Sequence, residues 1–138
     1  MTVRGLQFLA SIQKDGAIGD SRQKAVTALH VLAALSSGVQ PTHPAHGPSV
    51  RAACDWLLAN SSKSFLGGAE APNADHALVL LALSELVGTA AAPTNNLALY
   101  EKSRTALQYS LEIQDDGADP RHGGGWKPDD RTRVNDRM

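Results

Sequence analysis

Aromatic side chains are scarce in this 138-residue chain, in which two Phe, two Tyr and two Trp make up only 4% of the residues. Ala and Leu supply most of the 42% that is hydrophobic, and this favours helices, because strands are enriched in aromatic and β-branched residues. The only cysteine, Cys54, excludes an internal disulfide. A formal net charge of −1 argues against a nucleic-acid surface.

Long apolar runs are absent as well. No stretch reaches the roughly 18 uninterrupted apolar residues that a membrane-spanning helix needs. No stretch combines the charged start and the short apolar run of a signal peptide. These absences predict a soluble protein with no transmembrane segment and favour a cytoplasmic location. The length is that of one domain with a modest core.

Three related stretches recur along the chain, and each ends in a glycine turn. The first and third are RGLQFLASIQKDGAIGD (4–20) and ALQYSLEIQDDGADPRHGGGW (106–126), which share an aromatic residue, a leucine, a glutamine and an Asp-Gly turn. The second is VRAACDWLLANSSKSFLGG (50–68), with Asn60 in place of the glutamine. The glutamine positions are 47 and 54 residues apart, a period that suits a pair of helices with connections.

Two further stretches are apolar on every side, QKAVTALHVLAALSSG (23–38) and ADHALVLLALSELVG (74–88). A helix that is apolar all round is expected to be buried on all sides. The repeat copies instead predict helices with one wet face. In the second copy the apolar positions follow i, i+3, i+4, i+7 and i+8, namely Val50, Ala53, Cys54, Leu57 and Leu58. The alternation predicts an inner layer of dry helices and an outer layer of half-wet helices.

Capping residues predict the ends of the inner helices. Asp20 or Ser21 is expected to open the first, and Asn73 or Asp75 the second. A glycine is expected to close each helix.

The pattern of a basic, a small and an aromatic residue, then Leu, Gln and Gly-x-Trp, resembles the QW repeat of squalene and oxidosqualene cyclases. The alternating helices are similar to the α/α toroid that these enzymes share with protein prenyltransferase β subunits, and to bacterial prenyltransferase/squalene-oxidase-repeat proteins. The resemblance covers residues 4–126, although Ile18 replaces tryptophan in the first copy and Asn60 replaces glutamine in the second. It implies an all-α fold, a partial α/α toroid of about two and a half helix pairs. Residues 1–138 would form a single domain in which 115–138 are a polar loop and tail.

The resemblance also implies a structural role for the glutamine and the tryptophan. In the family, a glutamine at the end of an outer helix hydrogen-bonds backbone at the start of a neighbouring helix, and the tryptophan stacks over it. Glycines let the chain pass beneath the indole, where a Cβ would clash. By this comparison Gln13, Gln114, Gly125 and Trp126 belong to structural clasps.

Related toroids contain more inner helices than the two found here. The resemblance therefore implies a fragment of a longer toroid. Two dry helices would leave an apolar side uncovered, which predicts self-association or contact with the remainder of a toroid.

Asp20, Arg22 and His76 are the candidates for chemistry, because active sites of the family lie near the N-terminal ends of inner helices. Asp20 and His76 match, in place and order, an aspartate and a histidine that bind zinc in protein prenyltransferases. Arg22 occupies the position of the cysteine ligand, so no metal is expected. We expect Asp20 and His76 to face one concave side, and Arg22 to pair with Asp20 or to hold the polar end of a ligand.

No complete catalytic motif is present, and no cofactor is predicted. The Asp-x-Asp-Asp acid of protonating cyclases is missing, and the acidic loop 115–119 lacks the spacing of an EF-hand. His30, in the middle of a dry stretch, is expected to be a hydrogen-bonded core histidine. Whether the chain is an enzyme stays open.

Three functions are compatible with these features. The first, preferred by analogy of fold, is part of a toroid that binds an isoprenoid or another apolar ligand in a central cavity. The second is a noncatalytic helical-repeat scaffold that binds proteins. The third is a carbohydrate-active α/α toroid.

Overall fold

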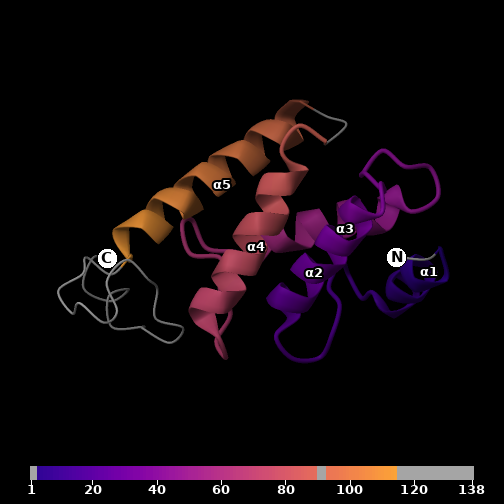
Figure 1. Ribbon diagram of the computed structural model, residues 1–138, viewed down its shortest axis with the longest axis horizontal. Helices are drawn as coiled ribbons and strands as arrows, with labels where there is room; N and C mark the ends of the chain where they lie inside the picture. The colour runs from indigo at the N-terminus through magenta and orange to yellow at the C-terminus, as the bar shows by residue number, and fades with distance from the viewer. Residues whose placement is uncertain (1–2, 90–92, 115–138) are drawn as a thin grey trace.

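The computed structural model describes residues 3–89 and 93–114. Within them the chain forms the helices α1 (Val3–Ile12), α2 (Gln23–Ser36), α3 (Gly47–Ala59), α4 (Pro72–Leu86) and α5 (Pro93–Glu112) (Figure 1). Apart from one isolated bridge between Lys14 and Ala17, these residues contain no β structure. The fold is therefore all-α, as predicted. None of the described helices has the length and apolarity required to cross a bilayer.

The helices are arranged around the contact between α2 and α4, which is the most extensive helix–helix contact in the described part of the chain. α3 packs against α2, and α5 packs against α4 (Figure 1). The stretches predicted to be dry thus lie side by side, and each contacts a helix that carries a copy of the sequence repeat.

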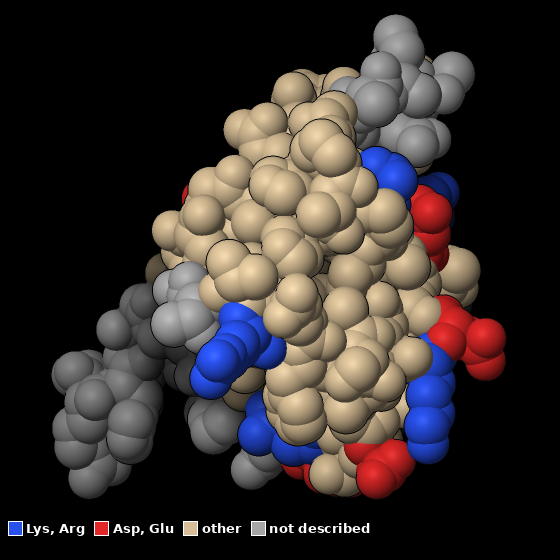
Figure 2. Space-filling view, turned by 90° about the vertical axis from the view of Figure 1, so that its right-hand side faces the viewer, with Lys and Arg blue, Asp and Glu red and all other residues tan. Residues whose placement is uncertain are grey.

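Large exposed apolar side chains are distributed unevenly over the helices. They occur on α1, α2, α4 and α5, whereas α3 has none. The view from the α1 side shows a face that is mostly uncharged (Figure 2). The helices at the two ends of the stack therefore leave apolar surface uncovered, and the central outer helix does not.

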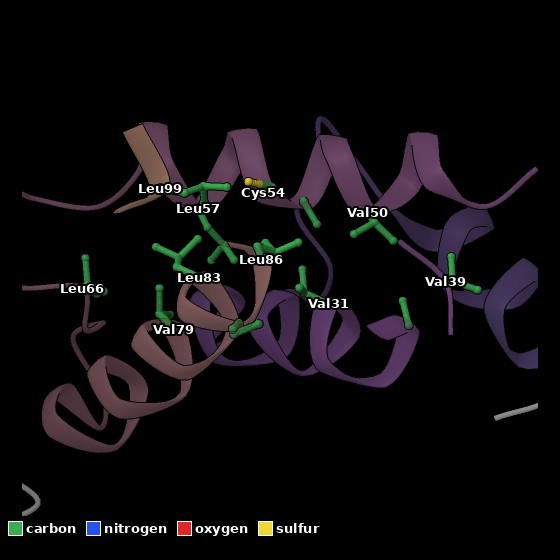
Figure 3. Packing of buried hydrophobic residues seen from close by; sticks show 14 of the residues in the cluster. Val31, Val39, Val50, Cys54, Leu57, Leu66, Val79, Leu83, Leu86 and Leu99 are labelled. Carbon is green, nitrogen blue, oxygen red and sulfur yellow. The ribbon is translucent and has the colours of Figure 1, made fainter. Parts of the chain in front are cut away.

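The core lies between α3 on one side and α2 with α4 on the other (Figure 3). Its largest fully buried aliphatic side chains include Val31, Val50, Leu57, Val79, Leu83 and Leu86. The stripe predicted for α3 is confirmed, because Val50, Ala53, Cys54 and Leu57 are buried and Leu58 packs against the cluster. Leu and Val at helical spacing thus bring the two layers together.

The two dry helices are less completely buried than their sequences predict. The prediction of 23–38 agrees with the start of α2, and that of 74–88 begins two residues inside α4. However, Leu29 and Leu81 are each 50% exposed. Burial on all sides is therefore wrong for both helices, because each has neighbours on only part of its circumference.

The start of α2 differs from the predicted cap. Arg22 occupies the N-cap position, with φ 45° and ψ 40° in the left-handed region, and its side chain makes no capping hydrogen bond. Neither Asp20 nor Ser21 is the N-cap. At the other end Gly38 has a φ of 77°, and its N–H donates to Leu35 O at 2.9 Å, which agrees with a glycine that closes the helix.

The start of α4 also differs from the prediction. The helix begins at Pro72, with Ala71 at the N-cap position and no side-chain capping bond, so neither Asn73 nor Asp75 is the cap. Proline suits the first helical position, where the backbone N–H that it lacks has no helical partner. Gly88, with φ 85°, follows the C-terminal end.

α2 and α4 are related by their contacts as well as by their sequences. Ahead of α2, the N–H of Ile18 donates to Thr27 Oγ1 at 3.0 Å. Ahead of α4, the N–H of Leu66 donates to His76 Nδ1 at 3.0 Å. Thr27 and His76 are each the fifth residue of their helix. Corresponding positions of α2 and α4 are therefore 49 residues apart.

Candidate functional site

In the part of the chain that the structure describes, two cavities lie on different sides of α4. The polar cleft, of about 370 Å³, lies at the N-terminal ends of α2 and α4, and its lining includes Asp20, Arg22, Lys24, Trp56, Glu70 and Asp75. The apolar groove, of about 380 Å³, lies between α4 and α5, and its lining includes His76, Ala77, Leu80, Leu81, Leu107, Ser110 and Ile113.

The structure separates the residues that the sequence grouped into one site. Asp20 and Arg22 line the polar cleft, whereas His76 lines the apolar groove. Successive residues of an α-helix are rotated by about 100°, so Asp75 lies at the cleft while the adjacent His76 lies at the groove. The structure therefore does not bring Asp20 and His76 together in one cavity.

Arg22 binds Asp75 rather than Asp20. Its Nε donates to Asp75 Oδ1 at 3.1 Å, and its Nη2 donates to the same oxygen. The Asp75 side chain is 1% exposed and that of Arg22 is 40% exposed. The hydrogen bond and the charge of Asp75 raise the pKa of Arg22. The sequence predicts Asp75 only as a possible helix cap, so this buried ion pair was missed.

Two cationic side chains of the polar cleft, those of Arg22 and Lys24, bind groups in or ahead of α4 and so connect consecutive parts of the fold. Arg22, at the start of α2, is bound to Asp75 of α4. Lys24 donates from Nζ to Gly67 O at 2.8 Å, in the segment ahead of α4, and burial lowers the pKa of Lys24. The cleft therefore acts in the structure as a junction between the two helix pairs.

His76 is held on both ring nitrogens. Its Nδ1 accepts from the N–H of Leu66 at 3.0 Å, so the proton of the neutral ring resides on Nε2. That nitrogen lies 2.8 Å from Ser110 Oγ of α5, and the Ser110 hydroxyl donates to Ala106 O at 3.0 Å. Phe65 stacks on the ring, with centroids 5.3 Å apart. Burial lowers the pKa of His76, which favours this neutral, donating form.

These contacts leave neither nitrogen of His76 available to a metal in this conformation. In residues 3–89 and 93–114, no group of three or more His, Cys, Asp or Glu side chains is placed to hold a metal ion. The histidine instead connects α4 to α5 and to the segment that follows α3.

Gln13 lies just after α1 and joins it to α3. Its Nε2 donates to Gly16 O at 2.9 Å and to Ser49 O at 3.0 Å. Its Oε1 accepts from Ser49 Oγ at 3.0 Å, and Ser49 lies in the first turn of α3. His30 Nε2, buried as expected for a core histidine, is 3.0 Å from the same hydroxyl. A glutamine that ends one outer helix thus bonds backbone at the start of the next.

The second copy of the repeat uses different contacts. Asn60, the C-cap residue of α3, donates from Nδ2 to Trp56 O of the last turn at 2.9 Å and so does not reach the next outer helix through this bond. Lys102 of α5 instead donates from Nζ to Ser61 O at 3.2 Å and to Ser62 O at 2.7 Å. A lysine therefore ties the end of α3 to the following outer helix.

Part of the third copy lies outside the described residues. Gln114 is half-buried just beyond α5. Gly125, Trp126 and the acidic loop 115–119 fall in the part of the chain that is not described. The third clasp therefore stays a prediction.

The apolar groove has aliphatic walls. Leu81 of α4 and Leu107 of α5 line it and are 50% and 53% exposed. Its polar lining includes the His76–Ser110 pair, whose ring nitrogen and hydroxyl are hydrogen-bonded to each other. The groove therefore offers mainly apolar contact. Sequence reasoning missed it, because it depends on how α4 and α5 are placed relative to each other.

Comparison of the chain with protein-family models, with curated proteins and with solved structures finds no match.

Proposed function

We propose that this chain is an α-helical repeat unit that binds an apolar helix in the groove between α4 and α5. One observation carries the proposal: the α2 positions that correspond to the groove are buried or half-buried inside the molecule. Besides His76, the groove positions of α4 are Asn73, Ala77, Leu80, Leu81 and Ser84. With the offset of 49 residues they correspond to Lys24, Ala28, Val31, Leu32 and Leu35 of α2.

On α2 the corresponding surface is covered. Ala28 and Val31 are 0% exposed, and Leu32 and Leu35 pack against the core. Lys24 reaches the segment that leads into α4. Because α2 makes its largest contact with α4, a helix that bound α4 in the same way would occupy the apolar groove.

Such a helix would add a third member to the layer of α2 and α4. Growth by stacked helix pairs is the rule in α-solenoids, whose end units need a cap or a neighbour. We retain the α/α-toroid arrangement as part of the proposal, because the resemblance of the repeats implies it and the two-layer packing is compatible with it. The proposed function is binding, without catalysis.

The experiment is a fluorescence anisotropy titration of the full chain against a labelled peptide with the sequence of residues 23–36, flanked by lysines for solubility. We expect saturable binding, at least about tenfold weaker for Leu107→Glu, because a tenfold change corresponds to only ~1.4 kcal/mol. Leu97→Glu is the matched control, since Leu97 is also on α5 and 61% exposed but does not line the groove. Binding that both substitutions weaken equally, or neither weakens, contradicts the proposal.

An apolar small molecule such as an isoprenoid is the second candidate for the same groove. The volume of about 380 Å³ falls within the range of small-molecule sites, roughly 300–1,000 Å³, and the His76–Ser110 pair could orient a hydroxyl end. Farnesol is the probe for this candidate. If farnesol bound the wild-type chain but not Leu107→Glu, and the peptide did not bind, the small-molecule function would replace the first.

A further inference from the structure

We infer that the helix that fills the apolar groove is α2 of a second copy of this chain, so that copies associate head to tail. The inference rests on the proposed function, because it names the partner of the same groove.

α2 carries an open apolar stripe of the required kind. Val26, Leu29 and Ala33 are spaced i, i+3 and i+7 and lie on one side of the helix. Leu29 is 50% exposed, and Val26 and Ala33 are half-buried. We call these three residues the α2 stripe.

The α2 stripe corresponds to a side of α4 that faces the interior of the molecule. With the offset of 49 residues, its counterparts on α4 are Asp75, Leu78 and Ala82. Asp75 binds Arg22 at the start of α2, Ala82 is 0% exposed and Leu78 packs against the core. On α4, therefore, the side that carries Asp75, Leu78 and Ala82 faces the interior, and Asp75 on this side binds the start of α2.

The groove and the α2 stripe, both formed by described residues, are consequently complementary. Inside one copy, the inward-facing Asp75–Leu78–Ala82 side of α4 is bonded through Asp75 to the start of α2, the helix that α4 contacts most extensively. Between copies, the α2 stripe would meet the groove side of α4 in the same relationship. The contact already present between α2 and α4 thus continues from one copy to the next.

The exposed apolar side chains of the outer helices fit this arrangement. Phe8 and Ile12 of α1 are 61% and 40% exposed, and Leu107 and Leu111 of α5 are 53% and 60% exposed. In each copy α1 precedes α2 as α3 precedes α4. When α2 of the second copy fills the groove, α1 of that copy would therefore lie in the outer layer, next to α5 of the first copy. α1 also borders a largely uncharged face (Figure 2).

A groove-to-stripe contact is heterologous, and its symmetry makes a prediction that other forms of association do not share. A pair of copies still has one free groove and one free stripe, so association continues to a ring or a chain. A symmetric groove-to-groove pair would instead stop at two copies.

The experiment is sedimentation equilibrium on two single variants of the full chain. Leu107→Glu blocks the groove, Leu29→Glu blocks the α2 stripe, and Leu97→Glu is the control outside both. Wild type and Leu97→Glu should increase in average mass as concentration rises. Each blocked variant alone should have the mass of one chain. An equimolar mixture of the two should double that mass, because the intact stripe of one enters the intact groove of the other.

Several outcomes would overturn the inference. The first is a mixture of the two variants that remains at the mass of one chain. The second is association of Leu29→Glu alone when Leu107→Glu alone does not associate, because this result indicates groove-to-groove pairing. A wild-type chain with the mass of one copy at every concentration, yet able to bind the α2 peptide, removes the inference and leaves the proposed function standing. Circular dichroism checks that each variant folds. If Leu107→Glu does not fold, it is replaced by Leu81→Glu, at a groove position that is 50% exposed.

Discussion

Replacing Gln13 by glutamate tests the contact between the first two outer helices without changing the size of the side chain. The substitution removes the two hydrogen bonds to Gly16 O and Ser49 O, at 2.9 and 3.0 Å, and sets a carboxylate against both carbonyls. It preserves an acceptor for the Ser49 hydroxyl. Two neutral hydrogen bonds contribute together about 1–3 kcal/mol. At ~2–4 °C per kcal/mol for a chain near this length, the melting temperature should fall by roughly 2–12 °C.

The assay is thermal unfolding followed by circular dichroism, with Gln7→Glu as the control. Gln7 is exposed on α1, so its substitution introduces the same charge on the same helix without entering the Gln13 contact. We expect the free energy of unfolding of Gln7→Glu to lie within about 0.5 kcal/mol of that of the wild type, as is usual for surface substitutions. Equal melting temperatures for the two variants would refute the structural role of Gln13.

Other predictions concern single buried or crowded positions. The lowered pKa of His76 means that the unfolded chain binds more protons below about pH 6.5, so the free energy of unfolding should fall as pH drops from there. His76→Gln should flatten this dependence in urea titrations, and an unchanged slope would contradict it. Burial raises the pKa of the Cys54 thiol to about 12, so DTNB should label it only after urea is added; rapid labelling of the folded chain would contradict its burial. Gly16 has a φ of 95°, and in Gly16→Ala the new Cβ would lie 2.4 Å from the carbonyl oxygen of Ala52 in α3. Gly38 has a φ of 77°, and a Cβ added there meets nothing within 4 Å. Gly38→Ala should therefore cost only the left-handed backbone, about 1–2 kcal/mol, and Gly16→Ala should cost more; equal melting temperatures would refute the close approach.

The positions of the helices could be predicted because the buried side of each helix shows as apolar residues at helical spacing in the sequence. The apolar run that begins at Gln23 marks the start of α2, and Val50, Ala53 and Leu57 mark the buried side of α3. These patterns are local, so they can be recognised in each helix without knowing which helices are its neighbours.

The contacts between helices could not be predicted in the same way. Arg22 and Asp75 are 53 residues apart, and their pairing depends on the rotation of α4 about its axis. The same rotation places His76 at the groove, away from Asp20. The cap preference of Asp20 and Ser21 was overridden at Arg22, whose left-handed backbone accompanies its bond to Asp75.

The uncovered apolar surface was predicted only in outline. The dry character of 23–38 and 74–88 indicated that some apolar side chains would lack neighbours, and Leu29 and Leu81 are half-exposed. The groove itself required the position of α5, because Leu107 and Ile113 supply its second wall.

Docking of a helix in the apolar groove is tested most directly by amide hydrogen exchange of the full chain, with and without the α2 peptide. Bound peptide should slow the local opening of the segments that form the groove, residues 73–84 of α4 and residues 107–113 at the end of α5. Exchange in α3, which does not line the groove, should not change. Protection confined to α4 and α5 is the predicted result, and protection centred on α3, or none in either groove segment, would contradict it.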